Sequence, residues 1–145
     1  MLFSQIIGQQ EVKRKLLRSV AEQRVPHALL LRGPEGVGKL ALALAYAQYI
    51  NCENKSAADS CGTCPSCVKY NKMAHPDLHM VFPIIKWNKQ SVVCDDFVSE
   101  FRTAVLRNPY LSDQEWYACI ADDAKQGMIY ANESQEIIRK LSLKT

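Results

Sequence analysis

The stretch ALLLRGPEGVGKLALALAYAQYI, from Ala28 to Ile50, decides the fold. An apolar run of buried-strand type, residues 28–32, leads into the octet GPEGVGKL, residues 33–40, and a strong helix-forming run follows. Strand, glycine loop and helix is the order that a phosphate-binding loop requires. The octet matches the pattern G-x-x-x-x-G-K-[ST] at every position but the last. We predict a phosphate loop here, with a ligand-free glycine turn as the alternative.

Each residue type in the octet has a chemical role. Gly33, Gly36 and Gly38 allow backbone N–H groups to turn inward around phosphate oxygens, and Lys39 can reach the outer phosphates. Leu40 stands where a Ser or Thr hydroxyl would coordinate Mg²⁺, and a methyl group cannot do this. The sequence therefore argues against ATP hydrolysis and assigns no catalytic residue. Nucleotide binding without turnover and a scaffolding role both stay open.

A second signal is a set of four thiols within sixteen residues: Cys52, Cys61, Cys64 and Cys67. Four is the coordination number of a closed structural zinc site, and this spacing can fold into a tetrahedral S₄ cage. We predict one structural Zn²⁺. Disulfides are the first alternative, although residues 1–10 show no secretory signal. An iron–sulfur cluster is the second, although its usual fourth-cysteine spacing is absent.

For the other two cysteines and for two of the histidines, the sequence supports less specific predictions. Cys94 and Cys119 are isolated in the sequence, so each is predicted to be a small buried apolar residue. His75 and His79 could supply metal ligands, but four cysteines already complete a zinc site.

Composition limits the classes of protein that fit. With 145 residues and 48% hydrophobic content, the chain can bury one sizeable core, so one domain, residues 1–145, is expected, with residues 52–67 as a zinc-binding insertion. No apolar run reaches the length of a membrane span, and 23% charged residues suit a soluble cytoplasmic protein. The net charge of +3 is too small to argue for nucleic-acid binding.

Periodicity and capping residues predict the remaining elements. A second strand is expected at residues 78–82, parallel to residues 28–32, and residues 84–94 read as a loop. Helices are predicted at 9–23, at 40–50, from Asp95 or Asp96 to 108, after the capping box Ser112/Glu115, and at 133–143 with Ile137, Ile138 and Leu141 as the buried stripe.

One segment allows two interpretations. Residues 116–121 are apolar and precede Asp122 and Asp123, which is also the pattern of a strand that ends in metal-binding carboxylates. The capping box before it and the pair Trp116/Ile120 at i, i+4 favour a helix.

Four segments together carry a resemblance to a known family. Residues 6–16 (IIGQQEVKRKL), residues 24–39 (RVPHALLLRGPEGVGK), the cysteine insertion and residues 75–79 (HPDLH) resemble the N-terminal AAA+ domain of bacterial DNA polymerase III clamp-loader subunits. The insertion is the specific part, because a generic AAA+ ATPase has none. The resemblance implies a three-layer α/β P-loop NTPase core with an inserted zinc module. It also implies truncation, since the family's Walker B strand, sensor residues and arginine finger would lie beyond Thr145.

Within that family, two subunits share the insertion. Gamma/tau hydrolyses ATP, whereas delta-prime commonly has a degraded nucleotide site, so Leu40 favours the delta-prime type and gamma/tau is the alternative. The resemblance implies DNA replication in a bacterial cytoplasm, within the DNA-directed DNA polymerase (nucleotidyltransferase) holoenzyme, by a subunit that is not itself the polymerase. The implied partners are gamma/tau, delta, the sliding clamp and primed DNA, with no membrane.

Two other functional classes make distinct demands on the sequence. An active ATPase would need another Mg²⁺ ligand, for which Asp122 and Asp123 are the local candidates. A zinc-ribbon module for nucleic acid would need exposed basic and aromatic residues around the cysteines. The candidates nearby are Lys55, Lys69, Tyr70 and Lys72.

Overall fold

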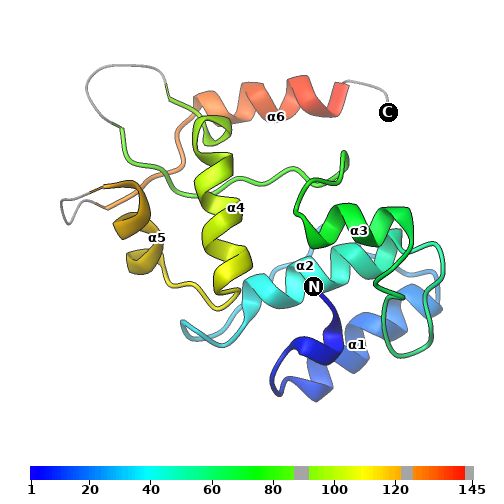
Figure 1. The fold of residues 1–145 in the computed structure, drawn as a ribbon. Helices are drawn as coiled ribbons and strands as arrows, with labels where there is room; N and C mark the ends of the chain where they lie inside the picture. Colours follow the sequence, from blue (N-terminus) through cyan, green and yellow to red (C-terminus); the bar gives the residue numbers. More distant parts are fainter. Residues whose placement is uncertain (87–91, 122–125, 143–145) are drawn as a thin grey trace. The chain divides into compact units, whose positions relative to one another are not determined.

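A computed structural model describes residues 1–86, 92–121 and 126–142, and its regular elements are all helical within these ranges (Figure 1). The chain divides into two compact units, Met1–His75 and Pro76–Thr145. The helices are η1 (Phe3–Gln5), α1 (Gln10–Ala21), α2 (Lys39–Asn51), α3 (Pro65–Asn71), η2 (Cys94–Phe97), α4 (Val98–Arg107), α5 (Asp113–Ile120) and α6 (Asn132–Ser142).

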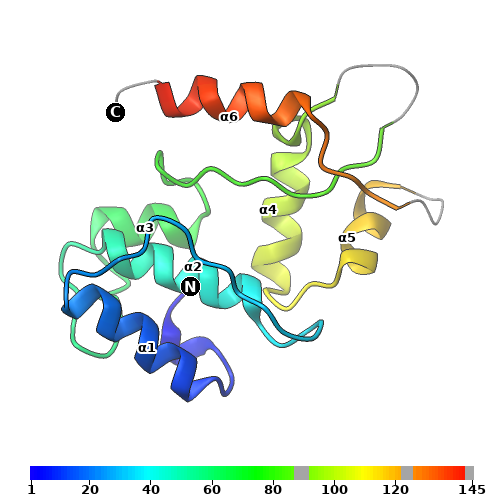
Figure 2. The ribbon, with the colours of Figure 1, turned by 180° about the vertical axis from the view of Figure 1, so that it is seen from behind.

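The first unit is built around α2. This helix is apolar on nearly every side, as expected of a helix that is buried rather than amphipathic. Ala41 and Ala45 are fully buried, and α1 packs against α2 through Leu16. Figure 2 shows the extended segment between α1 and α2 running across this unit. The predictions of helices at 9–23 and 40–50 are confirmed within one or two residues at each end.

One carboxylate ties the N-terminal segment to the loop that follows α2. Asp59 accepts hydrogen bonds from the backbone N–H groups of Phe3 at 3.0 Å, Ser4 at 2.8 Å and Ser60 at 2.8 Å. The Phe3 ring then lies edge-on to Tyr49 of α2, with ring centroids 5.9 Å apart. The cysteine insertion therefore helps to hold the first residues of the chain on the core.

The second unit has an aromatic core. The rings of Phe82 and Phe101 stack with centroids 3.9 Å apart, and Trp116 lies edge-on to both at 5.3 and 4.9 Å. The indole N–H of Trp116 donates to the carbonyl of Pro83 at 2.7 Å, so the buried ring keeps its polar group satisfied. Packing of α4 against α5 thus also fixes the extended segment before residue 84.

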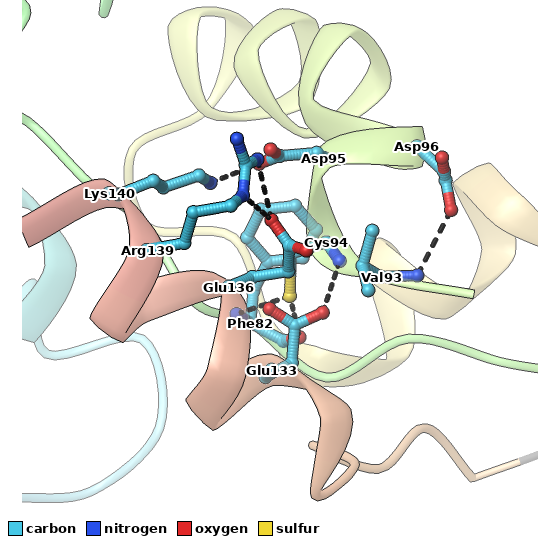
Figure 3. Close-up of polar contacts among 9 residues, drawn as sticks. All are labelled: Phe82, Val93, Cys94, Asp95, Asp96, Glu133, Glu136, Arg139 and Lys140. Carbon is cyan, nitrogen blue, oxygen red and sulfur yellow. Dashed lines mark hydrogen bonds and ion pairs between the residues drawn. The ribbon is translucent and has the colours of Figure 1, made fainter. Parts of the chain in front are cut away.

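Polar contacts attach α6 to η2, the 3₁₀ turn that precedes α4 (Figure 3). Glu133 is 3% exposed, and its carboxylate accepts a hydrogen bond from the backbone N–H of Cys94 at 2.5 Å. In the last turn of α6, Lys140 pairs with Asp95. Cys94 itself is buried, and its thiol donates to the carbonyl of Phe82 at 3.1 Å.

The two predicted strands are wrong as elements of this structure. Residues 28–32 and 78–82 are extended but not paired into a ladder, and the bridge between Ile84 and Met128 is the single strand-type pairing in the described ranges. A strand exists only with a neighbour that satisfies its backbone groups. At Phe82 the Cys94 thiol takes that place, and Leu30 is 86% exposed.

Helix predictions in the second unit are mostly confirmed. Ser112 caps α5 and exchanges side-chain and backbone hydrogen bonds with Glu115, so residues 113–120 form a helix and not a Walker B strand. The helix predicted from Asp95 or Asp96 starts later, at Val98, because residues 94–97 form a 3₁₀ turn in which Asp96 accepts from Val93 N. Asp122 and Asp123, and residues 87–91 of the predicted loop, lie outside the described residues.

The buried stripe predicted for the last helix is wrong. Ile138 is 68% exposed and Leu141 is 70% exposed, and Ile137 is only half-buried, whereas Glu133 is buried. Glu133 and Lys140 are seven residues apart, hence on one face of the helix, and their contacts turn that face toward η2. At 3.6 residues per turn, Leu141 lies about a quarter of a turn and Ile138 about two-fifths of a turn around the helix from that face.

We expect Glu133→Ala to lower the free energy of unfolding of the second unit by about 1–3 kcal/mol, because the buried N–H of Cys94 loses its acceptor. Glu133→Gln keeps an acceptor and should cost less. Denaturant titration followed by Trp116 fluorescence measures both. The matched control is Glu136→Ala, which removes only an exposed i, i+3 pair with Arg139 and should cost about 0.5 kcal/mol or less. Equal losses at residues 133 and 136 would contradict the role of the buried carboxylate.

Candidate metal centre and phosphate loop

The glycine loop leads into α2, as the sequence predicts. Gly36 has φ of 71° and Gly38 has φ of 92°, and Gly38 is the N-cap of α2. This left-handed region favours glycine because a Cβ would clash there. The octet therefore has the backbone that its glycines predict, at the N-terminus of a buried helix where backbone N–H groups and the helix dipole favour an anion.

Lys39 folds back over the loop. Its Nζ donates to the carbonyl oxygens of Gly33 at 3.0 Å and Pro34 at 2.6 Å. An incoming phosphate would have to compete with these carbonyls for the ammonium group. Leu40, the next residue, is half-buried and offers no oxygen for a metal.

The four predicted cysteines come together, and no other group of this kind occurs in the described part of the chain. Their sulfur atoms all lie within 4.8 Å of one another. Cys52 and Cys61 are 3.6 Å apart, and Cys61 and Cys67 are 3.9 Å apart. Tetrahedral coordination with Zn–S bonds of about 2.3 Å requires sulfur separations of about 3.8 Å, so the donor set fits such an ion. A disulfide would need about 2.05 Å, and all six cysteines are free.

Local structure places each of these thiols. Cys52 is the C-cap of α2, and Cys64 is the N-cap of α3, a short helix not predicted from the sequence, which carries Cys67 in its first turn. Backbone N–H groups donate to three of the sulfur atoms: Cys61 N to Cys52 and Cys64 N to Cys61, each at 3.3 Å, and Cys67 N to Cys64 at 3.5 Å. Such bonds favour thiolates, which are the metal-binding form.

The thiols differ in electrostatic environment. Backbone hydrogen bonds, first from Thr63 and then from Cys64, lower the pKa of Cys61 to about 6. The backbone N–H of Cys67 lowers the pKa of Cys64 in the same way. Burial raises the pKa of Cys67 to about 12. Backbone hydrogen bonds thus favour the thiolate form at Cys61 and Cys64, whereas burial disfavours it at Cys67.

The remaining candidate residues lie apart from the cluster. His75 stacks on Tyr70 with ring centroids 4.4 Å apart and shares a hydrogen bond of 3.2 Å with Ser66, so its ring serves packing. Cys94 is buried as predicted, and burial raises its pKa to about 11. Cys119 is exposed, so the prediction that it is buried is wrong. Sequence reasoning missed Asp59 and Gln48, since a lone polar residue carries no periodic signal.

The fold and the site thus define a chain in which a glycine loop of phosphate-loop sequence opens a buried helix and a cluster of four cysteines, a donor set that could hold a metal ion, follows that helix. The family described as DNA polymerase III, delta subunit, matches residues 8–134, which is most of the chain. The chain belongs to this family.

The matches to curated relatives cover about half of this chain and only a small part of each relative's own length. The delta' subunit of DNA polymerase III from Bacillus subtilis is 37% identical over 75 residues, which cover 52% of this chain and 22% of that protein. The gamma/tau subunit from Mycobacterium tuberculosis is 38% identical over 66 residues, covering 46% and 11%. Protein STICHEL-like 4 of Arabidopsis thaliana is 35% identical over 69 residues, covering 48% and 7%. No solved structure matches.

None of the helices in the described ranges combines the length and the apolar composition that a membrane crossing needs.

We expect inorganic phosphate to bind at residues 33–39 with the same affinity in the presence and absence of Mg²⁺, because the N-terminus of α2 does not depend on Leu40. NMR titration of the Gly36 and Gly38 amides measures this. Lys39→Ala should weaken binding by about tenfold, the loss of one charge-assisted hydrogen bond. Amide resonances that do not move at millimolar phosphate would identify the loop as a ligand-free glycine turn.

Proposed function

We propose that this chain is the N-terminal AAA+ part of a bacterial DNA polymerase III clamp-loader subunit of the non-hydrolysing, delta-prime type. The observation that carries the proposal is the conjunction of a phosphate loop lacking its metal-binding hydroxyl with a four-thiol module, in a chain whose residues 8–134 match the delta subunit family. The role is to help open the sliding clamp and place it on primed DNA, in cytoplasmic assembly with gamma/tau and delta.

Leu40 supports the non-hydrolysing assignment. Mg²⁺ neutralises the charge that develops on a transferring phosphoryl group, and a loop without the hydroxyl holds this ion poorly. In the structure, Lys39 is engaged by the carbonyls of Gly33 and Pro34. The subunit would act as a rigid partner beside a gamma/tau ATP site and would not be the polymerase of the holoenzyme.

An ATP-hydrolysing subunit of the gamma/tau type is the second candidate. Its support is the similarity to gamma/tau proteins: the 38% identity over 66 residues is close to the 37% identity over 75 residues with delta'. This candidate requires a metal ligand that replaces the missing hydroxyl. Nucleotide titration with and without Mg²⁺ separates the two, because only the second requires the ion for tight binding.

A nucleic-acid function of the cysteine module has less support. Single-stranded nucleic acid binds to exposed aromatic rings, on which its bases stack. Tyr70, the aromatic residue of α3, is 5% exposed and is covered by His75. Its ring is therefore unavailable to bases, although Lys69 and Lys72 beside it are exposed.

For the module we propose one structural Zn²⁺, held by Cys52, Cys61, Cys64 and Cys67. The metal would supply the positive charge that offsets four thiolates and would close the loop between α2 and α3. Four protein ligands leave no open position, so the ion has no part in a reaction. Because Asp59 lies within the same loop, metal binding would also order residues 3 and 4.

We expect the zinc-loaded protein to show one thiol that reacts rapidly with a thiol reagent, the exposed Cys119. Chelation should make the four cluster thiols reactive, Cys61 first because of its lowered pKa, and should reduce helical circular dichroism locally. Cys94 serves as the internal control, since it should stay protected until the second unit unfolds. Unchanged reactivity after chelation, or a brown chromophore in the purified protein, would contradict a zinc site.

We expect Lys39→Ala in the full-length subunit to reduce clamp loading by less than about tenfold, equivalent to roughly 1.4 kcal/mol in barrier height, because the loop does not turn over ATP. The measurement is a clamp-loading assay with reconstituted subunits. The control is the equivalent phosphate-loop lysine of gamma/tau, whose replacement should abolish loading. A larger loss from Lys39→Ala would identify a working ATP site and favour the gamma/tau type.

A further inference from the structure

A buried amide side chain lies next to the thiol cluster. Gln48, on the last turns of α2, is 0% exposed, and its Nε2 has no hydrogen-bond partner among the described groups. A buried amide donor without a partner is uncommon and calls for an explanation, such as an acceptor that forms only in another state of the protein. Cys67, whose thiol interacts with the Gln48 side chain, is also 0% exposed.

The orientation of the Gln48 amide is fixed by its oxygen. Oε1 accepts a hydrogen bond of 2.7 Å from the main-chain nitrogen of Met1, which also donates to Asn71 Oδ1 at 2.9 Å. Asn71 in turn donates to the carbonyl of Gly62 at 3.2 Å, within the turn that carries two of the thiols. Because Oε1 points toward the Met1 nitrogen, the two N–H groups of the amide point away from it.

Cys67 is the thiol that most needs such a donor. It is 0% exposed, so water cannot solvate its thiolate, and its polar neighbours include the Gly62 main chain and the Gln48 side chain. Cys52, Cys61 and Cys64 each accept a backbone N–H at 3.3–3.5 Å. Four thiolates around one divalent cation leave a net charge of −2 in a buried site, so donors to the sulfur atoms are stabilising.

We propose that Gln48 is a positioning residue of the metal centre, whose amide N–H donates to the Cys67 thiolate when the four cysteines hold a metal ion. The inference rests on the proposed zinc site and deepens it. Through Gln48 and Cys52, α2 contributes both a ligand and an outer hydrogen bond. The same helix that begins at the phosphate loop thereby holds the metal module at its other end.

The test uses Gln48→Met, which keeps the length of the side chain and removes both the amide donor and the acceptor of the Met1 amine. We expect Zn²⁺ affinity, measured by competition with a chromophoric chelator, to fall by about 10- to 100-fold, the usual effect of losing an outer-sphere partner. With Co²⁺ in place of zinc, the sulfur-to-cobalt charge-transfer bands should shift, because one thiolate loses its hydrogen bond. A purely structural role of Gln48 would not move these bands.

Two further variants keep the test decisive if Gln48→Met does not fold. Gln48→Glu places a carboxylate beside the thiolate and should bind metal more weakly than Gln48→Lys, which restores a donor. The matched control is Tyr46→Phe. Tyr46 is also on α2 but lies away from the cysteines, and the change removes its hydrogen bond to Ser19. Metal affinity and the cobalt spectrum should stay unchanged.

The outcomes separate this inference from the proposed zinc site. Wild-type protein that binds neither Zn²⁺ nor Co²⁺ would overturn the zinc site and this inference with it. If the wild-type protein binds both metals, two results would overturn the role of Gln48 alone. The first is a Gln48→Met variant whose affinity stays within about threefold of wild type and whose bands do not shift. The second is a Gln48→Glu variant that binds metal as tightly as Gln48→Lys.

Discussion

Burial of α2 on nearly all sides is the constraint on which the first unit depends. Ala41 and Ala45 are fully enclosed, so the helix can neither tilt nor slide without opening voids. Its first turn is therefore a fixed end for the glycine loop, and its last turn is a fixed platform for Cys52. Both chemical features of the chain take their geometry from one packed helix.

The electrostatics of four neighbouring thiols constrain the structure at the C-terminal end of α2. The sulfur atoms of the four cysteines lie within 4.8 Å of one another. As thiolates without a cation they would repel one another in a buried site. As neutral thiols they form only weak hydrogen bonds. Backbone N–H groups donate to three of the sulfur atoms, and such hydrogen bonds favour the thiolate form. Asp59 extends this order to the start of the chain, where it accepts from Phe3 and Ser4. The four-cysteine cluster and the packing of the N-terminal segment are thus parts of one structure.

The second unit shows how polar anchors can override an apolar pattern. The sequence of α6 has a clear hydrophobic stripe, which by periodicity alone should face the core. Glu133 and Lys140 instead fix the face that meets η2, because a buried carboxylate must keep its hydrogen-bond donor (Figure 3). The aromatic core of Phe82, Phe101 and Trp116 forms without help from that stripe.

The sequence by itself determined what depends on neighbours along the chain: the helices at 10–21, 39–51 and 113–120, the capping box at Ser112, and the glycine loop before α2. The spacing of the four cysteines also indicated their cluster, since a short loop can bring them together by itself. Only tertiary structure decided whether the extended segments pair, which face of α6 is buried, and that Gln48 lies against the thiols. The reason is physical: strand pairing, helix orientation and burial of a single amide depend on partners distant in sequence, which no local pattern encodes.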